Sequence, residues 1–129
     1  EEAQAERVRH VAVAAELVGG TAEVCELIAG REFDRRADAF NSMRADLGSL
    51  ASAVAAMDLT RFADRNAVRA VLISLGAARR LLADIDAAER DASLSMHSIR
   101  QSARTMVEIV RRQAEELEIS VKAIEAPHP

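Results

Sequence analysis

The chain has 129 residues and a formal net charge of −4; half of its residues are hydrophobic, and only 2% are aromatic. This length suits one domain, and the scarcity of aromatics argues against a β-fold. Acidic and basic residues are interspersed, which argues against a basic nucleic-acid face, and no apolar run approaches the roughly 20 residues of a membrane span. We therefore expect an all-α domain over residues 1–126, with a tail at 127–129.

The first thirty residues repeat apolar side chains at three- and four-residue spacing, which predicts an amphipathic helix ending near Gly30. Gly19 and Gly20 lie inside it and weaken it by about 1 kcal/mol each relative to Ala, so they indicate close helix packing or a kink. Cys25 is the only cysteine, which excludes an intrachain disulfide, and its place in the stripe predicts a small buried hydrophobe. The expected buried stripe is Val8, Val11, Ala15, Val18, Ala22, Cys25 and Ala29.

A second apolar stripe follows. Between the two stripes the three–four spacing shifts by one residue, as expected for a turn near residues 30–34 or for a stutter in one long helix. Its clearest boundary is at residues 58–60, where Thr60 is a candidate N-cap for the next helix. The expected stripe is Phe33, Ala37, Phe40, Met43, Leu47, Leu50, Val54 and Met57.

The remaining apolar spacing stays in phase from residue 68 to residue 110 and leaves two architectures open. One is an antiparallel four-helix bundle, up-down-up-down, with turns near 30–34, 58–61 and 86–92. The other is a long two-helix hairpin, about 1–57 and 62–125, that pairs as a dimer; its second helix would be roughly 96 Å long. We favour the four-helix bundle because Asp84, Asp86, Asp91 and Ser93 can cap a break. The stripes are Val68, Val71, Leu75, Ala78, Leu82 and Ile85, then Ala92, Met96, Ile99, Ala103, Met106, Val110, Gln113, Leu117, Val121 and Ile124.

Residue spacing predicts no catalytic, metal or cofactor site, and we expect a protein that is not an enzyme. The histidines and the single cysteine lack the spacing of zinc, haem or di-iron ligands, and phosphate-binding glycine loops are absent from the sequence. His10 and His128 are expected to be solvated, and the four methionines (Met43, Met57, Met96 and Met106) to fill the core.

His97 is the candidate site residue. It lies beside the buried stripe, and on a helix Arg100, Gln101 and Arg104 share its side, where two guanidinium groups can pair with phosphate oxygens. Residues 97–103, His-Ser-Ile-Arg-Gln-Ser-Ala, resemble the phosphoacceptor motif of histidine-phosphotransfer domains, His-x-Leu-Lys-Gly-Ser-Ala/Ser, with Gln101 in place of the glycine. The resemblance implies a four-helix bundle with His97 as phosphoacceptor.

A broader resemblance is to helical signalling and sensor bundles of bacterial receptors, carried by residues 102–110 and by the Ala-rich heptads. It implies a non-enzymatic bacterial signalling or interaction domain that acts through helix packing and forms a homodimer or binds a signalling protein.

An extracytoplasmic ligand-sensing bundle is the third alternative for the function. We expect a cytoplasmic location, with a periplasmic sensor fragment as the alternative. The first residue, Glu rather than Met, indicates a processed or shortened product, and Pro127 and Pro129 argue against a helix that runs on into a membrane.

Overall fold

The structure is a computed structural model that describes residues 2–30, 36–62, 64–91 and 96–126, without the side chains of residues 36–40 and 96. Four α-helices account for most of this part: α1 (Glu2–Gly30), α2 (Arg36–Ala55), α3 (Arg65–Arg90) and α4 (Met96–Glu125). A short 3-10 helix, η1 (Leu59–Arg61), lies between α2 and α3. No strand occurs in the described part, nor does any helix there that is long and apolar enough to cross a membrane.

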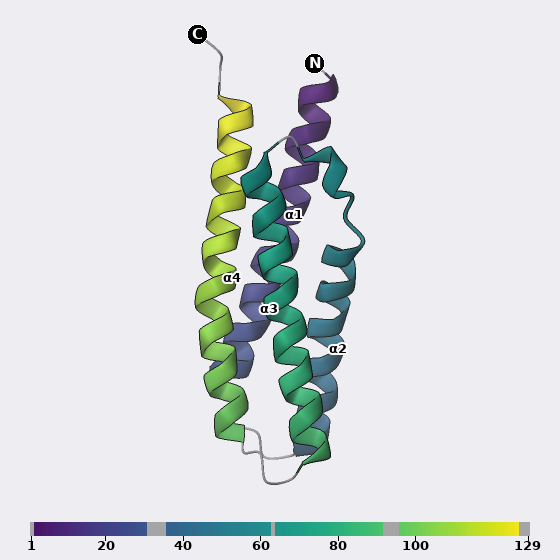
Figure 1. Cartoon of the computed structure of the whole chain (residues 1–129), viewed down its shortest axis with the longest axis vertical. Helices are drawn as coiled ribbons and strands as arrows, with labels where there is room; N and C mark the ends of the chain where they lie inside the picture. The colour runs from purple at the N-terminus through teal and green to yellow at the C-terminus, as the bar shows by residue number, and fades with distance from the viewer. Residues whose placement is uncertain (1, 31–35, 63, 92–95, 127–129) are drawn as a thin grey trace.

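The four helices form an antiparallel bundle in which each helix runs opposite to its neighbours along the chain (Figure 1). α4 packs against both α1 and α3, α2 packs against the same two helices from the opposite corner, and α1 meets α3 only across the diagonal. The four-helix prediction is confirmed. The long-hairpin alternative is wrong because α3 ends at Arg90 and α4 begins at Met96, alongside it. The predicted turn at 30–34 lies mostly outside the described residues.

Aspartates, rather than Thr60, cap the helices after the break at residue 58. The Asp58 carboxylate accepts hydrogen bonds from the Thr60 N–H and hydroxyl at 3.0 and 2.6 Å, and Asp64 accepts one from the Asn66 N–H at 2.8 Å. Each carboxylate thus satisfies a backbone donor that a helix start leaves unpaired. The prediction of Thr60 as N-cap is therefore wrong: Thr60 lies inside η1. Asp91, one of the predicted break residues, is the C-cap of α3.

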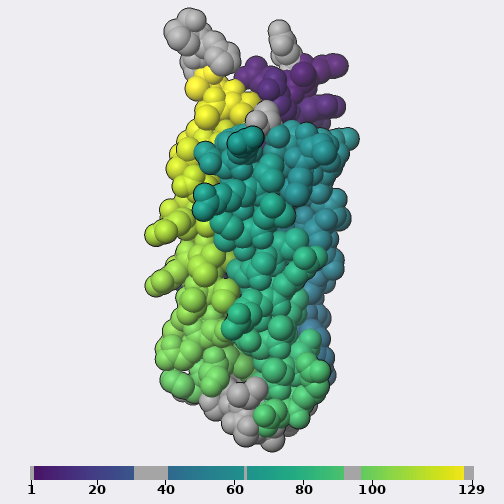
Figure 2. All heavy atoms as spheres, in the orientation of Figure 1, coloured from purple at the N-terminus to yellow at the C-terminus, as the bar shows by residue number. Residues whose placement is uncertain are grey.

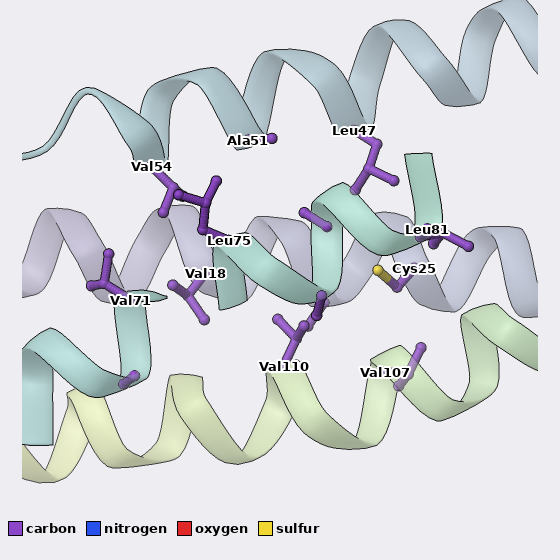
Figure 3. Close-up of a cluster of buried hydrophobic side chains, with 14 of the residues drawn as sticks. Val18, Cys25, Leu47, Ala51, Val54, Val71, Leu75, Leu81, Val107 and Val110 are labelled. Carbon is purple, nitrogen blue, oxygen red and sulfur yellow. The ribbon is translucent and has the colours of Figure 1, made fainter. Parts of the chain in front are cut away.

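The core consists of small and branched aliphatic side chains from all four helices (Figure 3). On α1 the predicted Val11, Val18, Ala22 and Cys25 are buried, but Ala14, Thr21 and Ile28 complete the stripe in place of the half-buried Val8, Ala15 and Ala29. Most of the other predicted positions are also buried, whereas Leu50, Met57, Val68, Leu82, Met106, Gln113, Val121 and Ile124 are half-buried. Phe33, Ala37, Phe40, Ala92 and Met96 lie outside the described side chains.

Polar contacts fix the register of α4 against its two main neighbours. Ser102 donates to Asp84 at 2.5 Å and Ser120 donates to Asp64 at 2.8 Å, one contact towards each end of the α3–α4 interface. On the other side, the Gln4 side chain donates to the Ile124 carbonyl at 2.7 Å, and Arg111 pairs with Glu26. Since hydrogen bonds to charged groups are stronger than neutral ones, the two Ser–Asp contacts favour one alignment of α3 and α4 over slipped ones.

Ser120→Ala tests this alignment, because Ser120 is buried and removing its hydroxyl leaves the Asp64 carboxylate short of one partner. We expect the free energy of unfolding to fall by about 1–2 kcal/mol, measured by urea denaturation. Thr105→Ala, which removes an exposed hydroxyl from the same helix as Ser120, is the control and should change stability by less than about 0.5 kcal/mol. Equal effects of the two substitutions would contradict the role of Ser120.

Candidate functional site

The predicted phosphoacceptor His97 is exposed and is the second residue of α4. Its Nε2 lies 3.5 Å from the Gln101 side-chain nitrogen, one helical turn further on. The ring is therefore open to solvent at the start of a helix rather than in its middle. Gln101 occupies the side of the ring where the phosphotransfer motif has glycine.

The structure brings His97 and Gln101 together. Arg104 is exposed on the next turns of α4, and Arg100 is half-buried with interactions of its own. In this arrangement Arg104 keeps its guanidinium in water, where it can pair with an arriving anion. The assignment of His97, Arg100 and Arg104 to a phosphoryl site stays a prediction.

Incubation of the chain with phosphoramidate tests that prediction directly. A phosphoacceptor at His97 should give an acid-labile adduct detected by intact mass at neutral pH, and His97→Gln should abolish it. His128→Gln also removes one imidazole, and it is the control that should keep the label. Absence of label on the unsubstituted chain, or its persistence in His97→Gln, would eliminate the phosphotransfer assignment.

His10 has a structural role that the sequence analysis missed. Its Nε2 lies 2.9 Å from the Asp58 carbonyl oxygen, and its ring packs against Phe62 at a centroid distance of 4.4 Å. These contacts tie α1 to the connection between α2 and α3. They pair residues that are far apart in sequence, so helical spacing on α1 alone carried no signal for them; the half-buried ring differs from the predicted solvated one.

Cys25 is fully buried in the core, as its position in the stripe predicts (Figure 3). Burial raises the pKa of its thiol to about 11, because a thiolate loses its hydration among apolar neighbours. Since the thiolate is the nucleophile, the folded protein keeps this sulfur unreactive at neutral pH.

In the folded chain only about one Cys25 thiol in a thousand is ionised at pH 8. The folded chain should therefore react with a thiol reagent such as DTNB at that pH at least about a hundredfold more slowly than the same chain in 6 M guanidinium chloride. Following the absorbance of released thionitrobenzoate measures both rates. Comparable rates in the folded and unfolded states would show that Cys25 is accessible.

The outward face of α2 carries an uncharged stripe of small side chains. Ser42, Ala45, Ser49 and Ser52 of α2, together with Ala56 directly after its last residue, are all exposed, and they recur at alternating spacings of three and four residues. We call this set the α2 stripe. Such spacing places them on one side of the helix, opposite the buried Met43, Leu47 and Val54. Apolar spacing carried no signal for this face, because three of its five residues are serines.

A groove of about 680 Å³ runs along the outside of the α1–α4 interface. Small residues of α1, namely Ala12, Ala15 and Gly19, leave it open, while Glu16, Glu23, Glu118 and Glu125 supply negative charge. Lys122 is the one cation among its lining residues. We call it the α1–α4 groove. Gly20 also lines the groove, and a Cβ built there would lie 3.4 Å from Leu50 of α2, an ordinary van der Waals contact.

The outward face of α3 has the opposite charge. Residues 65–83 contain four arginines and no acidic residue, and Arg65, Arg69, Leu72, Gly76, Arg79 and Arg80, here called the α3 ridge, are all exposed. Figure 2 shows α3 at the centre of a broad face, between α4 and α2, with nothing covering it. The arginines are thus accessible from solvent along most of the helix.

Comparison with protein-family models, curated proteins and solved structures finds no match for this chain. Within the residues that the structure describes, no group of three His, Cys, Asp or Glu side chains lies close enough to hold a metal ion. The candidate surfaces are the α2 stripe, the α1–α4 groove and the α3 ridge, together with the exposed His97.

Proposed function

We propose that this chain is a non-enzymatic helical interaction module that forms a homodimer by pairing α2 with α2 of a second copy. The observation that carries the proposal is the α2 stripe: five exposed small residues at heptad-like spacing with no charge among them. Small side chains let two helix backbones approach closely, and the three–four spacing keeps a continuous seam between crossing helices.

Charge supports α2 as the self-contact. Two copies of a chain with net charge −4 repel each other, and the repulsion is weakest where the contact surfaces carry no charge. A two-fold interface uses the same patch on both partners, so an uncharged patch is self-complementary in charge.

The resemblance to receptor helical bundles supports a bacterial signalling role for this dimer, in which pairing of α2 would bring two copies of an attached partner together. Phosphotransfer through the exposed His97 is the second candidate, tested above. Ligand sensing is less well supported, because the α1–α4 groove lies open along the outside of the bundle.

Ser49→Glu with Ala56→Glu tests the dimer. Both positions are exposed, so the fold should persist, but the two carboxylates would meet their symmetry mates across the seam without a counterion. We expect the unsubstituted chain to sediment with twice its 14.0 kDa mass at micromolar concentration and 0.15 M salt. The double variant should dissociate, with Kd raised at least about a hundredfold.

Ala5→Glu with Ala123→Glu is the matched control, since it adds the same charge at exposed positions of α1 and α4. It should keep the dimer. A monomeric unsubstituted chain, or a double variant of the α2 stripe that still dimerises, would refute the proposed function.

A further inference from the structure

The α1–α4 groove and the α3 ridge both carry charges that have no partner within the described part of the chain. Glu16, Glu23 and Glu118 make no ion pair there, whereas the neighbouring Glu26 is paired with Arg111. Arg65, Arg69 and Arg79 likewise make none, while Arg80 pairs with Asp84 on the same helix. Unpaired acids therefore line a concave surface, and unpaired arginines line a convex helix elsewhere on the molecule.

Glycines at the centre of both surfaces lack an explanation within the single chain. A Cβ added to Gly19 in the groove or to Gly76 on the ridge would meet no atom within 4 Å. Glycine weakens a helix interior relative to alanine, so internal packing favours alanine at both positions. Close approach of a second helix backbone is what a glycine on an open helix face permits.

The two surfaces are also comparable in length. Glu16 and Glu23 are seven residues apart on α1, about 10 Å along the helix, and Arg69 and Arg79 are ten residues apart on α3, about 15 Å. Arginine side chains are long enough to absorb the difference. Leu72 lies between these arginines with 50% of its surface exposed, where it can meet the small residues of the groove.

We propose that the α3 ridge of one copy docks into the α1–α4 groove of a second copy. The contact joins two different surfaces, so it is heterologous. The copy that contributes its ridge keeps a free groove, and the copy that contributes its groove keeps a free ridge. Such a contact extends into a chain or ring of copies instead of stopping at a pair. This contact is separate from the pairing through the α2 stripe. It is held by charges, so added salt screens and weakens it.

Charge exchange between the two surfaces tests the contact. Sedimentation velocity of the unsubstituted chain should show species larger than a dimer at 25 mM NaCl, and their association should weaken at least about tenfold at 500 mM NaCl. Glu16→Lys with Glu23→Lys, and separately Arg65→Glu with Arg69→Glu and Arg79→Glu, should each lose these species because groove and ridge then carry the same net sign. An equimolar mixture of the two variants should regain them, since each ridge again faces a groove of opposite charge.

Glu6→Lys with Glu108→Lys changes the net charge as the groove variant does, but at exposed positions outside the groove, and should still assemble. Gly19→Leu blocks the groove without altering charge and should abolish the salt-sensitive species, whereas Ala123→Leu on the exposed side of α4 should not. Unfolding by urea shows that each variant is folded.

The proposal is overturned if the unsubstituted chain shows no salt-sensitive assembly, or if the mixture of charge variants fails to restore it. Failure of the α2 dimer gives a different result. In that case the chain is monomeric at 500 mM NaCl and still assembles at 25 mM, so the two proposals can fail independently.

Discussion

The position of α4 between α1 and α3 is the constraint on which the rest of the bundle depends. α4 joins the first helix of the chain to the third, and its serines at positions 102 and 120 bind carboxylates of α3. Because the core contains small aliphatic side chains and few aromatics, no single large residue fixes the helix positions. The polar contacts at the two ends of the α3–α4 interface therefore determine which of several similar alignments the aliphatic stripes adopt.

Burial of one stripe on each helix also determines what the other faces carry. Once Val11, Val18 and Cys25 point into the core, the helical period places Glu16 and Glu23 beside α4 and away from the interior. On α3, burial of Val71, Ala78 and Ile85 leaves Arg69 and Gly76 outward. The charged groove and the charged ridge are thus consequences of packing, and they lie on different sides of the same molecule.

Spacing predicted the helices and most of the core because burial of one side of a helix leaves a three–four repeat in the sequence. It could not decide whether α3 and α4 were one helix, since the repeat continues in phase across the break. It also passed over Thr21 and Ser120, whose hydroxyls are buried because each bonds an acceptor, the Leu17 carbonyl and the Asp64 carboxylate. The contact between His10 and Asp58 depends on tertiary structure, so no local pattern in the sequence could predict it.

For the candidate site, spacing placed His97 beside the buried stripe. Its position in the first turn of α4 could be known only from the residue at which that helix begins.

The distance between the outer ends of α3 and α4 tests the central claim of the fold most directly. Spin labels at Arg65→Cys and Ile119→Cys, in a chain with Cys25→Ala, sit at exposed positions beside the Asp64–Ser120 contact. If α4 folds back along α3, double electron–electron resonance should give a separation on the order of 20 Å, that of adjacent helices plus the label arms. A separation on the order of 80 Å, the length of a continuous helix over these 54 residues, would contradict the bundle.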